Sequence, residues 1–460
     1  GDGPMGTPLY DMQRGFTDWA EMDAIKLEKL KKQIHRVYAQ SPFYRARFDE
    51  VGFRPEMLKS LSDLKHVPFM DKNQERASQA ESQAAGITAL GSHIVCDPRD
   101  VIRISSTSGT TGIPTFTGYT QADSEVTAEV MRRAMSIMGA EKGDVVMHAF
   151  VMSMWIAGLP VADIMQMAGF TVVPIGGQSG PERFAVTAKA VMPKQLNCTP
   201  SYATWMAGKL KEDFGIDVAD LGIKRILLGG EPGGSIPEVR DRLSKLWGGA
   251  EIYDGIGANH TSFFAAFNCQ HNTGLHLLAD DFLQLEILDP VTGESLPLED
   301  GVSGEGVFTA LQKECAPAIR FRTGDRLEIR RGRCACGRDT IRYAIKGRVD
   351  DMLLVRGVNV FPAAIQAIVN RFSDRGVSPT MRVVLKSPPP VQDPPLPVRV
   401  ELEREMPSED AARLAAEISE TVSKELRFRC QVELVPKGTL DAFQTDKNQK
   451  QQVFQKEYEA

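Results

Sequence analysis

Ser105-Ser106-Thr107-Ser108-Gly109-Thr110-Thr111-Gly112-Ile113-Pro114-Thr115 is the stretch that decides how this chain is interpreted. Its glycines let backbone N–H groups approach an anion closely, and its hydroxyls donate further hydrogen bonds. It lacks the Gly-Lys-Ser/Thr of a Walker A loop, and the β-prone runs at 101–104 and 116–119 favour a hairpin around it. The sequence therefore predicts a phosphate-binding loop, with an ordinary Ser/Thr/Gly surface loop as the alternative.

Three further blocks follow this loop along the chain. They are Gly229-Gly230-Glu231-Pro232, Phe321-Arg322-Thr323-Gly324-Asp325, and Gly347-Arg348-Val349-Asp350-Asp351 leading to Arg356-Gly357-Val358-Asn359-Val360-Phe361-Pro362. In this order the four blocks resemble the acyl-adenylate-forming superfamily of acyl-CoA synthetases, adenylation domains and luciferases, most closely its phenylacetate-CoA ligase branch. Residues 30–44 resemble the same branch, so the resemblance covers nearly the whole chain.

Length and composition agree with a large soluble enzyme. The 460 residues, 42% of them hydrophobic, exceed what one core usually supports, so two or more domains are expected. A net charge of -6 gives no reason to expect nucleic acid or an anionic membrane as partner. No apolar stretch approaches the ~20 residues of a membrane span, and the first residues lack a signal pattern. The sequence predicts a cytoplasmic protein and leaves a homodimer possible.

The expected fold class is α/β, with a large multi-layered amino-terminal domain of mixed sheets and a small mobile α+β carboxy-terminal domain. Strand-like and helix-like segments alternate up to about residue 345, which is typical of α/β layers. The small domain is predicted to have helices at 362–372 and 408–428, strands at 381–385, 398–402 and 431–435, and an exposed proline-rich hairpin loop at 388–397. The predicted domains are residues 1–349 and 350–460.

The resemblance implies that the large domain binds ATP and a carboxylic acid. Adenylation accumulates charge on phosphate oxygens, which positioned donors must stabilise. The predicted donors are Ser106, Ser108, Gly109, Thr110, Thr111 and Gly112, with Thr110 also assigned to catalysis. The resemblance assigns Asp325 to the ribose hydroxyls, with an ordinary turn aspartate as the alternative, and Arg348 to the nucleotide's charge. Gly230, Glu231, Pro232, Tyr253 and Asp254 are expected along the adenine.

Some positions depart from the family pattern. After Tyr253-Asp254-Gly255, relatives carry an aromatic residue and a glutamate that holds Mg²⁺, whereas this chain has Ile256 and His260. A neutral imidazole is a poor ligand for Mg²⁺, so His260 is predicted to contact a phosphate or the substrate carboxylate, or to line the pocket. Mg²⁺ stays an expected cofactor, although the residue that would hold it is undefined. Ile113 also replaces a frequent lysine.

Four residues form a candidate zinc site, namely Cys269, His276, Cys334 and Cys336, with His271 as a substitute ligand. Some phenylacetate-CoA ligase-like proteins look able to build a tetrahedral site from the matching residues. Seven cysteines in 460 residues do not indicate a disulfide framework, so the alternative is reduced core cysteines. The other cysteines have no partner in the sequence and are predicted to be small buried hydrophobes: Cys96, Cys198, Cys315 and Cys430.

The segment at 148–158, HAFVMSMWIAG, occupies the place where the branch lines its acyl pocket. Its large apolar residues Phe150, Met152 and Trp155 suit an aromatic acid, although core packing is the alternative. Residues 256–258, which are Ile256, Gly257 and Ala258, are predicted to complete the pocket. The sequence does not distinguish phenylacetate from hydroxylated, amino or heteroaromatic relatives.

The carboxy-terminal residues suggest a moving domain. In the family, a lysine near the end of the small domain enters the site for adenylation, and the domain then rotates to admit coenzyme A. Lys447 is the nearest match to that lysine, with Lys450 as a substitute and a solvated surface lysine as the alternative. Asp350 falls at the family's hinge position.

The sequence thus predicts an AMP-forming acid–thiol ligase. It would use ATP and Mg²⁺ to activate an aromatic or arylalkyl carboxylic acid as an acyl-adenylate, and then transfer the acyl group to coenzyme A with release of AMP. Two alternatives remain open at this point. The activated group could go to a carrier protein or another acceptor, or the chain could bind nucleotide without catalysis, as His260 and Ile113 suggest.

Overall fold

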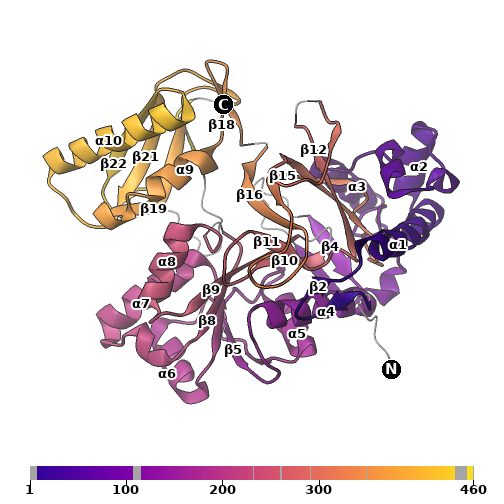
Figure 1. Cartoon of the computed structure of the whole chain (residues 1–460), viewed down its shortest axis with the longest axis horizontal. Coiled ribbons are helices and arrows are strands. Elements are labelled where there is room, and N and C mark those ends of the chain that lie inside the picture. Colours follow the sequence, from indigo (N-terminus) through magenta and orange to yellow (C-terminus); the bar gives the residue numbers. More distant parts are fainter. Residues whose placement is uncertain are drawn as a thin grey trace. The chain divides into compact units, whose positions relative to one another are not determined.

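This computed structural model describes residues 8–106, 115–231, 233–258, 262–290, 292–349, 351–440 and 453–458. The chain divides into two compact units (Figure 1). The first comprises Gly1–Ser235, Arg242–Thr323 and Leu327–Ala344, and the second comprises Ile236–Asp241, Gly324–Arg326 and Ile345–Ala460. The predicted division at residues 349 and 350 stays a prediction, because Asp350 lies outside the described residues.

Several helices of the first unit begin at side-chain caps that the sequence encodes. The Asp18 carboxylate accepts from the Glu21 backbone N–H, and the Ser41 and Thr199 hydroxyls cap helices that open with proline. The helices are α1 (Trp19–Gln40), α2 (Pro42–Glu50), α3 (Lys72–Ala84), α4 (Gln121–Ile137), α5 (Leu159–Ala168), α6 (Pro181–Val191), α7 (Pro200–Phe214) and α8 (Pro237–Leu246), of which α8 runs from the second unit into the first.

A twelve-stranded sheet, in the order β13-β12-β14-β15-β16-β11-β10-β9-β8-β7-β5-β6, is the framework of the first unit. Its parallel strands are β5 (Val145–His148), β6 (Thr171–Val173), β7 (Gln195–Cys198), β8 (Arg225–Leu228) and β9 (Glu251–Ala258). The strand order reverses at β5, since β6 and β7 lie on opposite sides of it. Open α/β sheets bind ligands outside the carboxyl ends of their strands at such a reversal, so the loops after β5, β7 and β8 are placed for a site.

After Ala258 the described strands are joined by turns instead of helices. These strands are β10 (Ser262–Asn268), β11 (Leu275–Leu277), β12 (Leu283–Leu288), β13 (Ser295–Leu296), β14 (Ser303–Ala310), β15 (Phe321–Arg330) and β16 (Arg342–Arg348). The predicted alternation of strands and helices up to residue 345 is therefore wrong beyond β9. Left-handed turn residues such as Asn272 (φ 47°) and Gly274 (φ 115°) return the chain directly, which makes antiparallel pairs without a crossover.

Two small hairpins complete the first unit: β1 (Tyr10–Asp11) with β2 (Gly15–Phe16), and β3 (Arg103–Ser106) with β4 (Phe116–Tyr119). Two buried cations of this unit form ion pairs with buried aspartates. Arg133 of α4 lies 2.7 Å from Asp281, and Lys26 of α1 lies 2.9 Å from Asp280. Because an unpaired buried charge is strongly destabilising, these pairs help to set where α1 and α4 pack.

The second unit is a small α+β domain, as predicted. It contains a sheet of order β22-β21-β19-β23 and a sheet of order β18-β17-β20. Its elements are β17 (Leu353–Val355), β18 (Val358–Val360), α9 (Pro362–Asn370), β19 (Val377–Leu385), β20 (Val391–Gln392), β21 (Leu396–Leu402), α10 (Ser408–Leu426), β22 (Cys430–Val435) and β23 (Phe454–Lys456). Helices α9 and α10 were both predicted, and each ends two residues before its predicted end. The proline-rich segment is not only a loop, because β20 pairs in parallel with β17.

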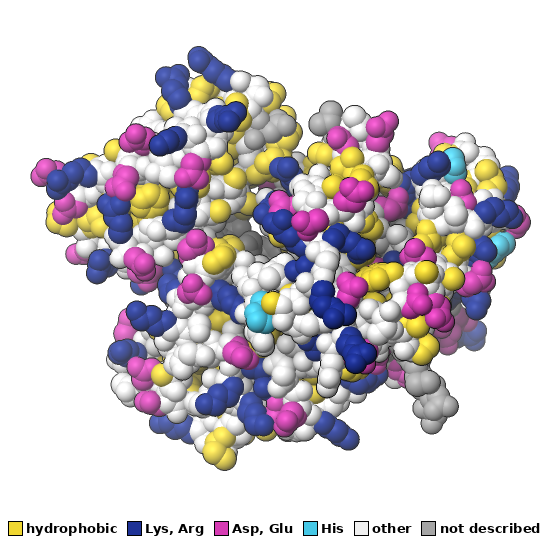
Figure 2. All heavy atoms as spheres, viewed as in Figure 1, with side chains coloured by type: hydrophobic (Ala, Val, Ile, Leu, Met, Phe, Trp, Pro, Cys, Tyr) yellow, Lys and Arg dark blue, Asp and Glu magenta, His cyan; other side chains and the backbone are white. Residues whose placement is uncertain are grey.

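Among the described residues, no helix is both long and apolar enough to span a bilayer. Basic and acidic side chains are interspersed over the visible surface of each unit (Figure 2).

Candidate active site

The hairpin predicted around the phosphate loop is present. Its strands β3 and β4 pair antiparallel, with Ser105 opposite Thr117. The Ser106 N–H donates to the Met154 carbonyl oxygen at 2.9 Å, so the start of the loop is tied to the segment after β5. The other predicted donors lie outside the described residues, and their role stays a prediction: Ser108, Gly109, Thr110, Thr111 and Gly112, together with Ile113.

Two predicted acid-pocket residues lie against the predicted nucleotide loop. The rings of Phe150 and Trp155 meet edge to face, with centroids 5.5 Å apart. A Cβ at Gly230 would lie 2.9 Å from Cη2 of Trp155, and one at Gly229 would lie 3.7 Å from Cζ of Phe150. Glycine at position 230, where φ is +82°, therefore allows the indole to approach the backbone. The aromatic pair forms one wall beside the loop after β8, and Met152 is half-buried on the same segment.

His148, at the end of β5, holds this aromatic segment in place. Its Nε2–H donates to the carbonyl oxygens of Ala157 at 2.9 Å and Gly158 at 3.0 Å, and its ring lies 5.4 Å from that of Phe150. The side chain is fully buried, and desolvation lowers the pKa of His148 to about 4 despite both hydrogen bonds. Because carbonyl groups only accept hydrogen bonds, Nε2 of the imidazole must carry a proton. Because its pKa is low, the imidazole is neutral near pH 7.

Glu231 faces the beginning of α7. Its carboxylate accepts from the Ser201 hydroxyl at 2.8 Å and from the Ser201 N–H at 3.3 Å. Desolvation raises the pKa of Glu231, although the two Ser201 hydrogen bonds act in the opposite direction. The helix dipole of α7 favours the ionised carboxylate at this end, so the contact fixes the nucleotide loop to the helix. Pro232 lies outside the described residues.

The predicted residues of β9 are divided between core and site. Tyr253 is buried in the core and donates its hydroxyl to Glu251 at 2.8 Å. Asp254 accepts from the N–H and hydroxyl of Ser235 at 2.9 and 2.7 Å. Farther along, Ile256 packs against the core, Gly257 is exposed and Ala258 ends the strand. His260 lies outside the described residues.

Asp325 and Arg348 lie together in the second unit. Nη1 of Arg348 donates to Oδ1 of Asp325 at 3.2 Å, and the neighbouring Val349 N–H donates to the Gly324 carbonyl at 2.6 Å. The Asp325 side chain is 30% exposed and the Arg348 side chain is 44% exposed. The acidic and basic groups that the sequence assigns to ribose and phosphate are thus adjacent and open to solvent.

The four predicted metal ligands also lie together, with all their ligand atoms within 4.8 Å of one another. Sγ of Cys269 lies 3.7 Å from Sγ of Cys334, and Sγ of Cys336 lies 3.7 Å from Nε2 of His276. A tetrahedral zinc ion with Zn–S bonds of about 2.3 Å separates its sulfur ligands by about 3.8 Å. Nδ1 of His276 is 2.7 Å from the Thr340 hydroxyl, which orients Nε2 toward the cysteines. The donor set and its geometry fit zinc.

The alternative ligand His271 is exposed and lies outside this cluster. Of the remaining cysteines, Cys198, Cys315 and Cys430 are buried as predicted, whereas Cys96 is only half-buried. The predicted hinge residue Asp350 and the carboxy-terminal lysines Lys447 and Lys450 lie outside the described residues.

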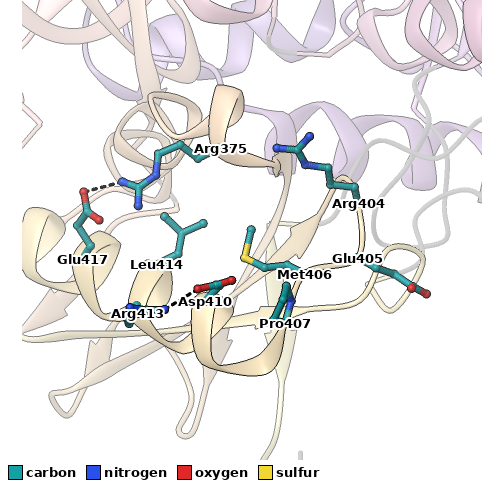
Figure 3. Close-up of a pocket in the computed structure, with 9 residues that line it drawn as sticks. All are labelled: Arg375, Arg404, Glu405, Met406, Pro407, Asp410, Arg413, Leu414 and Glu417. Atoms are coloured by element: carbon teal, nitrogen blue, oxygen red, sulfur yellow. Dashed lines mark hydrogen bonds and ion pairs between the residues drawn. The ribbon is translucent and has the colours of Figure 1, made fainter.

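A pocket of about 630 Å³ lies within the second unit (Figure 3). Its charges are balanced and largely paired, since Arg375 bonds Glu417 at 2.7 Å and Arg413 bonds Asp410 at 2.6 Å. The lining residues are Arg375, Arg404, Glu405, Met406, Pro407, Asp410, Arg413, Leu414 and Glu417. None of the predicted nucleotide, acid or metal residues is among them, so this pocket is not the candidate site.

Several polar residues that organise the site carry little or no signal in the sequence. Ser201 follows Thr199-Pro200, a helix-start signal that could have drawn attention to it as a partner for an acid. His148 begins the predicted acyl segment, and no sequence feature marks it as a buried hydrogen-bond donor. Asn268, Asn272 and Ser235 carry no motif; the pairing of β9 with β10 brings Asn268 to Asp254, and loop contacts add Asn272 and Ser235.

Comparisons with known proteins identify the family of this chain. Residues 27–309 match the AMP-binding enzyme family, and residues 357–456 match the AMP-binding enzyme C-terminal domain. The chain is 34% identical over 361 residues to a phenylacetate-coenzyme A ligase of Thermus thermophilus, which covers 76% of this chain and 75% of that protein. It is 34% identical over 372 residues to one from Pseudomonas putida, with 78% and 79% covered.

Solved structures show the same relationship. A 2-hydroxyisobutyryl-CoA ligase in the postadenylation state, in complex with 2-HIB-AMP, matches with a TM-score of 0.83 and 28% identity over 96% of this chain and 92% of that one. These matches and the ordered motifs lead to one conclusion. The chain belongs to the AMP-binding enzyme family, in its phenylacetate-CoA ligase-like branch.

Proposed function

We propose that this protein is an AMP-forming ligase that activates an aromatic or arylalkyl carboxylic acid and transfers it to coenzyme A. The observation that carries the proposal is the aromatic wall of Phe150 and Trp155, packed against Gly229 and Gly230 of the nucleotide loop. An apolar wall next to a nucleotide loop suits an acid whose carboxylate must reach the α-phosphate.

The reaction has two steps. A carboxylate oxygen attacks the α-phosphorus of ATP, and the bond to pyrophosphate breaks. The sulfur of coenzyme A then attacks the acyl carbon, the thiol loses its proton, and AMP leaves. Ser106 and the hydroxyls after it would stabilise the phosphate charge, and Asp325 would accept from the ribose hydroxyls. Mg²⁺ would supply countercharge when bound, and no described carboxylate is assigned to hold it.

Zinc at the Cys269, His276, Cys334 and Cys336 cluster is part of this proposal. Four protein ligands leave no open position, so the role would be structural. The ion would join the turn after β10 to the turn before β16, since these turns carry the cysteines.

The relatives suggest a rival class of acid. The solved structure at 28% identity is that of a 2-hydroxyisobutyryl-CoA ligase, so a small branched hydroxy acid is the competing substrate. The flat rings of Phe150 and Trp155 favour an aryl group instead, because aromatic pairs gain from edge-to-face and stacked contacts.

The test is pyrophosphate release over a panel of phenylacetate, benzoates and 2-hydroxyisobutyrate, each with and without coenzyme A. An aryl acid should give the highest kcat/KM, and the acyl-CoA thioester should form only when coenzyme A is present. Preference for 2-hydroxyisobutyrate would overturn the acid assignment. Pyrophosphate release without thioester would point to another acceptor, and ATP binding without any release would mark a non-catalytic protein.

A further inference from the structure

Four residues form a closed ring of side-chain and backbone hydrogen bonds beside the predicted nucleotide loop. Asp254 accepts from the N–H and hydroxyl of Ser235 at 2.9 and 2.7 Å, and its own N–H donates to Oδ1 of Asn268 at 2.6 Å. Nδ2 of Asn268 donates to Oδ1 of Asn272 at 3.1 Å, and Nδ2 of Asn272 donates to the Ser235 carbonyl at 3.4 Å. We call these residues, Ser235, Asp254, Asn268 and Asn272, the polar ring.

One side of the polar ring is anchored in the cysteine–histidine loop. Asn268 is fully buried and immediately precedes Cys269, and the Asn272 N–H donates to the Cys269 carbonyl at 2.9 Å. Asn272 has a φ of 47°, a left-handed conformation that asparagine tolerates better than most residues. The loop between Cys269 and His276 therefore presents the Asn272 amide to the ring.

The other side of the polar ring holds two segments of the nucleotide site. Ser235 follows Glu231 by four positions, and Asp254 stands on β9 before the predicted pocket residues. The two segments pack closely, because a Cβ at Gly234 would lie 2.8 Å from Cβ of Asp254. A shift of Asn268 or Asn272 would thus move the loop after β8 and strand β9 relative to each other.

We propose that Asn268 and Asn272 are positioning residues, which hold the loop after β8 and strand β9 in the geometry that binds the nucleotide. They need not touch the nucleotide, and they act through Ser235 and Asp254. This inference deepens the proposed function and rests on its assignment of the nucleotide site. Each amide hydrogen bond contributes modestly, so loss of the two that Asn272 makes should weaken nucleotide binding roughly fivefold to thirtyfold.

The test is Asn272→Gly in the full chain, because glycine keeps the left-handed backbone while removing the amide. ATP affinity is measured by calorimetry without acid or coenzyme A, alongside zinc content, thermal stability and the KM for the acid. Gln270→Ala, at an exposed position of the same loop, is the matched control. We expect Asn272→Gly to weaken ATP binding at least fivefold, with metal content and the KM for the acid unchanged, and the control to match the parent.

A second variant distinguishes loss of the polar ring from a general destabilisation of the fold. Ser235→Ala removes the hydroxyl donor to Asp254, and the double variant with Asn272→Gly should lose less ATP affinity than the sum of the two single losses, because both act through one ring. Parental ATP affinity in Asn272→Gly, or full additivity in the double variant, would overturn the inference. Failure of the proposed function would look different: the parent would bind ATP with the same dependence on Asn272, yet release no pyrophosphate with any acid.

Discussion

Asp325 illustrates how far single residues determine the chemistry of this site. Its carboxylate is only an acceptor at neutral pH, and the structure places it 3.2 Å from the guanidinium of Arg348 while leaving it partly exposed. A carboxylate that contacts Arg348 and is still partly exposed can accept from the vicinal hydroxyls of a ribose.

Asp325→Ala should therefore weaken ATP binding by about 2–3 kcal/mol, roughly 50-fold, because two ribose hydroxyls lose a charged acceptor. Calorimetric titration with ATP measures the change. Asp393→Ala, on the exposed surface of the same unit, serves as control. ATP affinity equal to that of the parent would remove Asp325 from the nucleotide site.

His148 gives a pH prediction. Burial lowers its pKa to about 4, below the ordinary value near 6.5 of the unfolded chain. The unfolded state thus binds more protons at pH 4.5–6, so the stability contributed by neutral His148 is complete above about pH 6.5 and is lost as the pH falls toward 4. His148→Gln keeps a donor for the two carbonyls and does not titrate. When the pH falls from 7 to 4.5, the unfolding free energy of this variant should therefore decrease by about 2 kcal/mol less than that of the parent.

Urea unfolding at both pH values measures this difference, and His148→Leu supplies the contrast. Leucine cannot donate to Ala157 and Gly158, so it should be less stable than the glutamine variant at pH 7 as well. If the glutamine variant and the parent lost equal stability on acidification, His148 would not be the titrating group.

At the scale of elements, the cysteine–histidine cluster joins two turns that are distant in sequence. Cys269 follows β10 and His276 lies in β11, whereas Cys334 and Cys336 belong to the turn between β15 and β16. The antiparallel pairing of β11 with β16 brings these turns together. A metal at this point would stabilise the folded state because the unfolded chain does not preform the site.

The protein purified without added metal should contain about one zinc per chain, and Cys334→Ser combined with Cys336→Ser should lose it. The double variant should also melt at a temperature lower by about 5 °C, since the metal-binding free energy no longer favours the folded state. Elemental analysis and calorimetry test both points, with Cys96→Ser as a control outside the cluster. A parent protein of full stability and without zinc would support reduced core cysteines instead.

At the scale of the whole molecule, the predicted domain rotation concerns residues outside the described part of the chain. If Lys447 enters the site for adenylation, Lys447→Ala should slow acyl-adenylate formation by orders of magnitude but leave thioester formation from supplied acyl-adenylate nearly intact. Asp350→Pro should impair the second step more, because a hinge must change its backbone angles. Stopped-flow measurement of each half-reaction distinguishes the effects of the two variants. Equal loss of both half-reactions in Lys447→Ala would contradict the assignment, and no loss would direct attention to Lys450.

The family, the α/β class, and helices α9 and α10 and strands β19, β21 and β22 of the small domain could be predicted from the sequence, because each is marked by residues that are neighbours along the chain. The motif blocks are contiguous, and helices α2, α6 and α7 likewise carry a local signal, because each opens with a proline. The β-prone runs that flank the phosphate loop likewise predicted the β3–β4 hairpin.

Apart from the cysteine–histidine cluster, the contacts between distant side chains emerged only from the folded structure. It brought Ser201 to Glu231 and closed the polar ring from Ser235 to Asn272. It also selected His276 over His271 as the fourth member of the metal cluster. These outcomes follow from the strand order and register of one sheet, which align residues separated by tens of positions, and neither periodicity nor local spacing encodes that alignment.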